Sequence, residues 1–220
     1  MDYVLQLVDL FLHLDKHLTE IVTQYGTSTY TILFLIVFCE TGLVVTPMLP
    51  GDSLLFAAGA IAAKGSLDVF KLALLLTLAA ILGDTVNYHV GKYIGPRVFS
   101  ESNPRFFKRE YLVRTAAFFE KHGGKTIIIA RFVPIIRTFA PFLAGVGRMN
   151  YARFLAYNVS GAILWVFLLV FAGYAFSELP FVKNNFSLVV LAIIVISVLP
   201  AVFEFMKARA ESQRSVGQAH

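Results

Sequence analysis

The sequence predicts an all-α polytopic membrane protein, built as an inverted repeat of two re-entrant helical hairpins with transmembrane helices and an N-terminal amphipathic helix. Of the 220 residues, 57% are hydrophobic and 15% charged, so few polar residues remain to cover a soluble exterior. Apolar runs fill most of the length. Two of these runs are interrupted by proline, glycine and charged residues. We expect one membrane domain, residues 1–206, and a cytoplasmic tail, 207–220.

The first 24 residues predict an amphipathic helix lying at the membrane interface. Apolar side chains recur at helical spacing, while charged side chains occupy other faces. The apolar positions are Val4, Leu7, Val8, Phe11, Leu14, Leu18 and Ile21. The sequence leaves open which side of the membrane this helix occupies.

Residues 28–64 predict the first re-entrant hairpin. Its apolar pieces, 30–38 and 53–63, are each shorter than the roughly 20 residues needed to cross a bilayer. The segment between them carries the helix breakers Pro47, Pro50 and Gly51. A helix, a broken turn and a helix returning to the same side satisfy this pattern, provided that the irregular backbone is buried or lines a watery cavity.

The rest of the chain repeats this arrangement. Residues 69–93 predict a span, and residues 96–125 a basic, aromatic cytoplasmic connector. Residues 126–146 predict a second re-entrant hairpin, and 151–175 and 186–206 predict further spans. The predicted breakers of the second hairpin are Pro134, Pro141 and Gly145.

Basic residues set the expected orientation. Cytoplasmic segments carry an excess of Lys and Arg, so the connector and the tail belong in the cytoplasm. Counting spans from there, the first hairpin enters from outside and the second from the cytoplasm, which makes an inverted repeat. Paired, interrupted apolar segments of this kind indicate a substrate site near the middle of the membrane in secondary transporters.

Four charged residues lie in the two hairpins. The first holds Glu40 and Asp52, and the second holds Arg131 and Arg137. An unpaired charge at this depth costs about 2.5–3.5 kcal/mol on insertion scales, so we expect the hairpin tips to meet and pair these charges. The pairs could act only as a clamp, but apolar packing would serve that purpose as well. Two arginines favour recognition of phosphate or carboxylate, which points to a lipid-like phosphate ligand held by Arg131 and Arg137.

Other polar residues of the spans are candidate accessory groups. Asp84, Asn87 and Tyr88 share one face of the 69–93 helix. Asp84 is either a functional acid or a hydrogen-bonding partner of its neighbours. Asn158 and Trp165 occupy the 151–175 span, where a tryptophan is more often a packing residue than a ligand platform.

Composition excludes several other classes. Cys39 is the only cysteine, so neither an internal disulfide nor a thiolate metal cluster can form, and we expect no metal and no cofactor. The net charge of +5 comes from basic residues clustered beside the spans, so no nucleic-acid partner is expected. The oligomeric state, a homo-oligomer included, is left open.

A charge balance suggests proton coupling. Two carboxylates and two guanidiniums sum to neutral, and a phosphate monoester brings about −1.5 to −2 charge. Protonation of Glu40 or Asp52 would release an arginine for the phosphate. The sequence therefore predicts proton-coupled movement of a phosphate-headgroup lipid. A proton-coupled small-molecule or drug transporter and a non-selective phospholipid scramblase stay open. An enzyme is not expected, because no nucleophile–base arrangement accompanies the arginines.

Three stretches carry a family resemblance: "TPMLPGDSLL", "GDTVNYHVGKYIG" and "ARFVPIIRTFAPFLAGVGRMNYARFLAYNVSGAILW". They resemble the DedA family of bacterial inner-membrane proteins, over about residues 2–206. The resemblance implies the twin re-entrant architecture of the eukaryotic VTT-domain lipid scramblases. It also implies a role in envelope maintenance, proton-motive-force homeostasis and drug resistance, and several members are implicated in returning undecaprenyl phosphate across the membrane. The family's essential acids match Glu40 and Asp52, and its essential arginines match Arg131 and Arg137.

Overall fold

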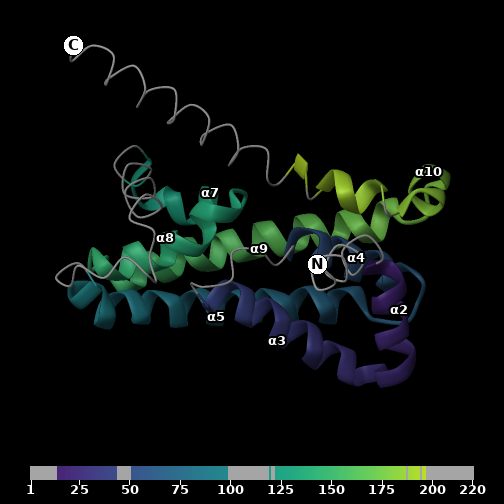
Figure 1. Ribbon diagram of the computed structural model, residues 1–220, viewed down its shortest axis with the longest axis horizontal. Coiled ribbons are helices and arrows are strands. Elements are labelled where there is room, and N and C mark those ends of the chain that lie inside the picture. Colours follow the sequence, from purple (N-terminus) through teal and green to yellow (C-terminus); the bar gives the residue numbers. More distant parts are fainter. Residues whose placement is uncertain are drawn as a thin grey trace, which may run out of the picture.

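The computed structural model describes residues 14–43, 51–98, 119, 122–186, 188–193 and 195–196. Within these residues every regular element is a helix, which confirms the all-α prediction. The elements run in the following order: α2 (Leu14–Tyr25), η1 (Gly26–Ser28), α3 (Thr29–Gly42), α4 (Gly51–Ala63), α5 (Val69–Val98), η2 (Gly123–Lys125), α7 (Thr126–Ala130), α8 (Pro134–Val146), α9 (Tyr151–Phe176) and α10 (Pro180–Asn184) (Figure 1).

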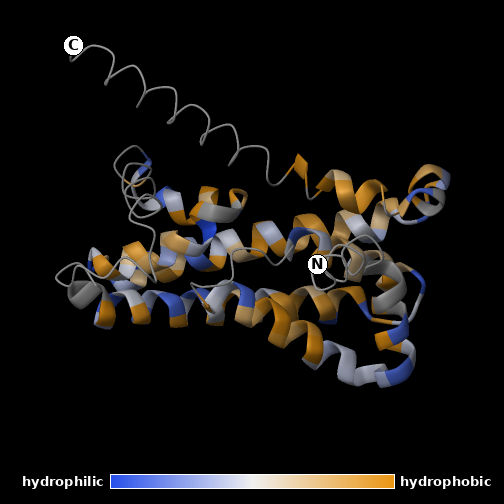
Figure 2. Ribbon diagram, in the orientation of Figure 1, coloured by the Kyte–Doolittle hydropathy of each residue, from blue (hydrophilic) through white to orange (hydrophobic). Residues whose placement is uncertain are grey.

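Three described segments are long and apolar enough to cross a membrane: Glu20–Gly42, Val69–Ile94 and Tyr151–Phe176. The last two confirm the helices predicted at 69–93 and 151–175. Hydrophobic residues cover most of their length, and hydrophilic positions lie mainly in the C-terminal half of α5 and the N-terminal half of α9 (Figure 2). The side of α5 that faces away from the protein is apolar at every fourth residue, at Phe70, Leu74, Leu78, Leu82 and Val86. Such a stripe suits contact with lipid tails.

The first candidate span is longer than the sequence analysis predicted. α3 alone has 14 residues, but η1 joins it directly to α2, giving the 23-residue stretch Glu20–Gly42. The chain changes direction at this junction (Figure 1), where Gly26 adopts φ +52°, a backbone conformation that favours glycine. The predicted interfacial helix is confirmed as helical over residues 14–25, and residues 1–13 lie outside the described part.

Two breaks separate neighbouring helices, α3 from α4 and α7 from α8, whereas the re-entrant course of the hairpins stays a prediction. We call α3, residues 43–50 and α4 the first broken segment, and α7, residues 131–133 and α8 the second broken segment. Leu43 is extended at the start of the first break. Val133 is extended before Pro134, which opens α8, as expected because a residue before proline avoids helical geometry and proline suits the first turn.

The six predicted breakers divide into three groups. Gly51 and Pro134 begin α4 and α8, whereas Pro47 and Pro50 lie outside the described residues. The prediction was wrong for Pro141 and Gly145, since both lie inside α8. Pro141 removes only one backbone N–H while the hydrogen bonds on either side continue, and a packed helix tolerates that loss. Gly145 serves close packing instead of a turn.

Each long helix carries one helix from each broken segment. α3 and α8 pack on α5, and α4 and α7 pack on α9. Four glycines bring the helices so close that an added Cβ would overlap a facing backbone carbonyl. The facing pairs are Gly59 with Val170 and Gly173 with Phe56 between α4 and α9, and Gly145 with Tyr88 and Gly91 with Phe142 between α8 and α5. The two interfaces therefore use the same reciprocal contact.

The starts of the two long helices are also built alike. The Asp68 carboxylate accepts the Lys71 N–H at 2.9 Å before α5, and the Asn150 side chain accepts the Arg153 N–H at 3.2 Å before α9. These are N-caps, which satisfy amide donors in the first turn. Asp68 precedes Gly91 by the same number of residues as Asn150 precedes Gly173.

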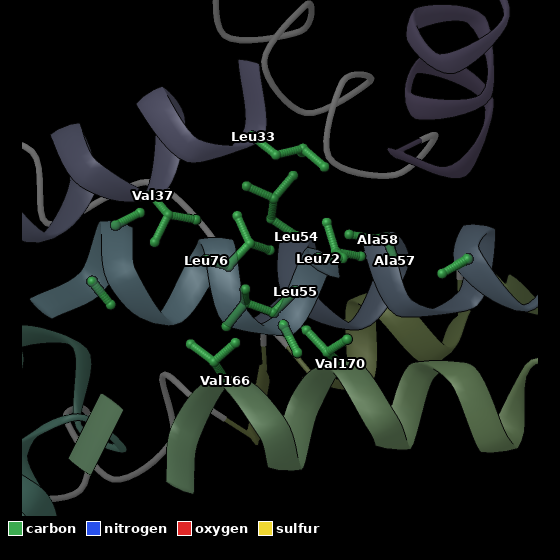
Figure 3. Packing of buried hydrophobic residues seen from close by; sticks show 14 of the residues in the cluster. Leu33, Val37, Leu54, Leu55, Ala57, Ala58, Leu72, Leu76, Val166 and Val170 are labelled. Atoms are coloured by element: carbon green, nitrogen blue, oxygen red, sulfur yellow. The ribbon is translucent and has the colours of Figure 1, made fainter. Parts of the chain in front are cut away.

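Apolar clusters surround the middle of the molecule. The larger joins α3, α4, α5 and α9, through residues such as Leu33, Leu55, Leu76 and Val166 (Figure 3). A smaller cluster includes Tyr88, Ile127, Ile136, Ala140 and Phe154. Polar residues lie between the clusters: Asp84 follows Ala80 and precedes Tyr88 on α5, and Asn158 lies between Phe154 and Ala162 on α9.

The structure describes only parts of the predicted connector, 96–125, and of the predicted last span, 186–206. α5 continues through Pro96 to Val98, three residues into the predicted connector. Residues 186, 188–193 and 195–196 are helical, as predicted for the 186–206 span. The remainder of that span and the 207–220 tail lie outside the described residues.

Candidate functional site

The first broken segment contributes two carboxylates. Glu40 lies in the last turn of α3 and is only 3% exposed. Asp52 lies in the first turn of α4, where the positive end of the helix dipole favours an acid. The Gly51 N–H donates to Glu40 Oε1 at 3.2 Å, which ties the end of α3 to the start of α4. Gly51 has no room for a side chain, since a Cβ there would collide with the Glu40 carboxylate.

Arg137 of α8 joins these two acids. Its Nη2 pairs with Glu40 Oε1, and its Nη1 lies 3.2 Å from Asp52 Oδ1. The guanidinium thus uses both terminal nitrogens on carboxylates from two different helices. Such a planar fork suits paired oxygens better than a lysine ammonium does.

Arg131 forms a separate ion pair. It lies in the break after α7 and is 1% exposed. Its Nη2 donates to Asp84 Oδ2 and to Asn158 Oδ1, both at 2.5 Å. Asn158 in turn donates to the Ile81 carbonyl at 3.1 Å, which orients its amide oxygen toward Arg131. This group joins the second break to α5 and α9.

Trp165 connects the two ion-pair groups. Its indole N–H donates to Asp52 Oδ1 at 2.7 Å. The guanidinium carbons of Arg137 and Arg131 lie 4.9 Å and 5.8 Å from its ring centroid, within the range of cation–π attraction. Fully buried in α9, Trp165 packs as the sequence suggested. It also contacts the charged groups directly.

The structure brings Arg137 together with both predicted acids, but the pairing of Arg131 differs from the expectation. Only Arg137 contacts Glu40 and Asp52, while Arg131 pairs with Asp84. Asp84 was proposed only as an accessory residue. The sequence signal for it was present, because a carboxylate inside a span requires a partner.

Two other predicted accessory residues have different roles. Asn87 Nδ2 donates to the Thr41 carbonyl at 3.3 Å and to the Thr138 carbonyl at 2.9 Å, so it links α3 and α8 across α5. Tyr88 lies apart from the ion pairs and donates to the Met149 carbonyl at 2.5 Å, in the turn before α9. Ser53, which the sequence analysis did not select, has a buried hydroxyl without a partner.

The charges of the site do not balance. It holds three carboxylates and two guanidiniums, instead of the two and two of the sequence-based count. Several buried polar atoms also lack a hydrogen-bonding partner among the described residues: Glu40 Oε2, Asp84 Oδ1, Asn87 Oδ1, Arg131 Nε and Arg131 Nη1. Unpaired buried donors and acceptors are costly. The arrangement is therefore suited to exchange one ionic partner for another.

These features define a helical membrane protein with buried ion pairs at two helix breaks, and the comparisons with known proteins identify its family. The VTT domain matches residues 49–175. The chain is 54% identical to Protein DedA of Escherichia coli (strain K12), over 98% of this chain and 99% of the relative. It therefore belongs to the DedA family of membrane proteins.

More distant relatives match over a smaller share of the chain. The chain is 45% identical to the uncharacterized membrane protein Rv0364 of Mycobacterium tuberculosis (strain ATCC 25618 / H37Rv), over 80% of this chain and 78% of the relative. It is 38% identical to the inner membrane protein YqjA of Escherichia coli (strain K12), over 69% of each chain. No solved structure matches this chain.

Proposed function

We propose that this protein translocates a phosphate-headgroup lipid, such as undecaprenyl phosphate, across the bacterial inner membrane, and that protons drive the movement. One observation carries the proposal. Two buried arginines, Arg131 in a helix break and Arg137 in the first turn of the next helix, are paired with three carboxylates beside the long apolar helices α5 and α9. Buried ionisable groups inside membrane segments are functional by default, because their cost requires a reason.

The choice of phosphate follows from the arginines. Guanidinium groups bind phosphate oxygens through several parallel N–H bonds. In the ion pairs those bonds go to carboxylates, so a phosphate can take the place of a carboxylate without leaving the arginine unpaired. The isoprenoid or acyl tail would stay in the lipid. No covalent bond is made or broken in this scheme, so the protein acts as a transporter and not as an enzyme.

Proton coupling follows from the excess of carboxylates. Three acids share two guanidiniums, and a phosphate monoester adds about −1.5 to −2 charge. Low-dielectric surroundings make such an excess expensive. Protons on Glu40, Asp52 or Asp84 would offset it, and their release on the other side would free the arginines from the lipid.

The proposed movement uses the two broken segments as re-entrant hairpins of an inverted repeat, with the C-terminus in the cytoplasm. The reciprocal glycine contacts and the matching N-caps support this view, because each long helix meets one helix of each segment in the same way. In secondary transporters, inverted repeats place the substrate at their interface and expose it alternately to either side.

A liposome assay tests the proposal. Purified protein is reconstituted in phosphatidylcholine vesicles that contain undecaprenyl phosphate, and headgroup exposure is followed over time. Arg137→Lys is expected to slow translocation about 100-fold, because a point charge cannot replace the fork. Glu40→Gln is expected to abolish the response to an imposed pH gradient. The exposed Arg153→Lys is the control.

The alternative functions predict other results. Equal movement of phosphatidylcholine, phosphatidylethanolamine and undecaprenyl phosphate without a gradient would indicate a scramblase. Gradient-driven uptake of a water-soluble compound, undisturbed by the lipid, would indicate a small-molecule transporter. Wild-type rates for both Arg137→Lys and Glu40→Gln would refute the proposed mechanism.

A further inference from the structure

The two arginines of the site are not equivalent. Arg137 uses Nη1 and Nη2 on two carboxylates. Within the part of the chain that the structure describes, Arg131 uses only Nη2, and its Nε and Nη1 are buried without a partner. The Arg131 guanidinium is 1% exposed, and its two unpaired nitrogens can still donate hydrogen bonds to an anion.

The counter-charge at Arg131 is also smaller. Asp84 is its one carboxylate partner in the described residues, whereas Arg137 has Glu40 and Asp52. The second ligand of Arg131 Nη2 is the neutral amide of Asn158. Asp84 Oδ1 is itself unpaired. Arg131 therefore faces less negative charge than Arg137, and fewer of its terminal nitrogens are hydrogen-bonded.

The backbone beside Arg131 is a glycine. An added Cβ at Gly161 would lie 3.1 Å from both Cδ and Nε of Arg131, tighter than ordinary van der Waals contact. Gly161 lies on α9 between Asn158 and Trp165, on the helix that also supplies both of those contacts. Any larger residue would fill the space next to the unpaired Nε.

We infer that Arg131, Asp84 and Asn158 form a second anion station, separate from the Arg137 group and specific for a phosphate oxyanion. The inference rests on the proposed function and divides its single site into two. Nε and Nη1 of Arg131 bind the phosphate oxygens, while Nη2 remains on Asn158 and Asp84. Trp165, within cation–π range of both guanidiniums, lies between the stations.

Two stations give the anion an ordered path. A phosphate at Arg131 displaces no ion pair, because it uses nitrogens that are unpaired. Binding at Arg137 requires release of Glu40 or Asp52. The anion therefore enters first at Arg131, and its transfer to Arg137 is the step that breaks carboxylate contacts.

The sequence supplies a reporter for this site. Trp165 is the only tryptophan of the chain, and it contacts both groups. Its emission in the full-length protein in nanodiscs can be titrated with inorganic phosphate and, separately, with farnesyl phosphate. Agreement between the two probes would assign recognition to the phosphate alone, whereas a response to farnesyl phosphate only would assign it to the lipid.

Two variants test the second station in opposite directions. Asp84→Asn keeps the shape but removes the competing negative charge, so we expect about tenfold tighter binding of the responding probe and about tenfold slower lipid translocation. Gly161→Ala places a methyl group beside Nε, and we expect about tenfold weaker binding. Ser160→Ala, an exposed neighbour on α9, is the matched control and should bind as the wild type does.

The inference is overturned if Asp84→Asn binds both probes no more tightly than the wild type, or if Gly161→Ala binds them equally well. If one variant fails to fold, the other still decides. Failure of the proposed function looks different. In that case the wild type moves no phosphate lipid, yet both variants shift phosphate binding as expected.

Discussion

The two broken segments pack alike but carry opposite charges. The helix after each break contacts a long helix through reciprocal glycine–carbonyl pairs, on α9 for the first segment and on α5 for the second. The first segment supplies Glu40 and Asp52, and the second supplies Arg131 and Arg137. The two segments are thus alike in helix packing and different in charge. Substitutions at the charged residues test the difference, and substitutions at the glycine contacts test the likeness. The expected effects run from the largest to the smallest.

Removal of an arginine should distinguish the two ion-pair groups. Arg137→Leu leaves the buried Glu40 and the partly buried Asp52 without their cation, and we expect the free energy of unfolding to fall by about 3–5 kcal/mol. Arg131→Leu leaves one such carboxylate and should cost less. Unfolding in mixed detergent micelles measures both, with the exposed Arg153→Leu as control. Equal losses for the two arginines would show that the two ion-pair groups contribute equally to stability.

Recovery by a second substitution checks the cause. Adding Glu40→Gln to Arg137→Leu removes one stranded charge, so part of the lost stability should return. No recovery would mean that Arg137 stabilises the fold by packing and not by its charge.

The glycine contacts should show the equivalence of the two interfaces. Gly91→Ala and Gly173→Ala each force a Cβ against a backbone carbonyl, and we expect each to cost about 1–3 kcal/mol. The same unfolding measurement applies. Gly147→Ala, in the exposed turn after α8 with φ −72°, is the control and should change little. Clearly unequal losses at Gly91 and Gly173 would show that the two interfaces are alike in geometry but not in their contribution to stability.

Trp165 contacts charged residues of both ion-pair groups. Trp165→Phe keeps an aromatic ring and removes the N–H bond to Asp52, which should cost about 1.5 kcal/mol. The effect should be smaller in an Asp52→Asn background, because both changes alter one hydrogen bond. Full additivity of the two losses would separate Trp165 from Asp52.

The smallest effect is expected at the helix starts. Asp68→Ala and Asn150→Ala each remove an N-cap, at a cost of about 1 kcal/mol. Thermal unfolding should show similar losses for the two. A loss at only one position would show that the two caps do not contribute alike.

The sequence predicted the breaks and the meeting of opposite charges because both depend on local rules. Pro134 and the short apolar runs mark helix ends, and a charged side chain inside the bilayer requires a partner. It could not predict which arginine meets which acid. That choice depends on the register of α7 and α8 against α5 and α9, and hydropathy carries no information on register.

Two further differences have physical causes of the same kind. Pro141 looked like a break, but a helix can lose one hydrogen bond where its neighbours hold it. Trp165 looked like packing, because the sequence does not show that its N–H faces Asp52. The close approaches at Gly59, Gly91 and Gly173 were likewise hidden, since a glycine in an apolar run shows no partner in the sequence.

Helix packing divides the described helices into two blocks. α3 and α8 pack on α5, and α4 and α7 pack on α9. Glycines bring the backbones into close contact between α8 and α5 and between α4 and α9. The pairs Arg137–Asp52 and Arg131–Asp84 both cross from one block to the other. Sliding of one block past the other would therefore break both bridges, so these two ion pairs hold the blocks together.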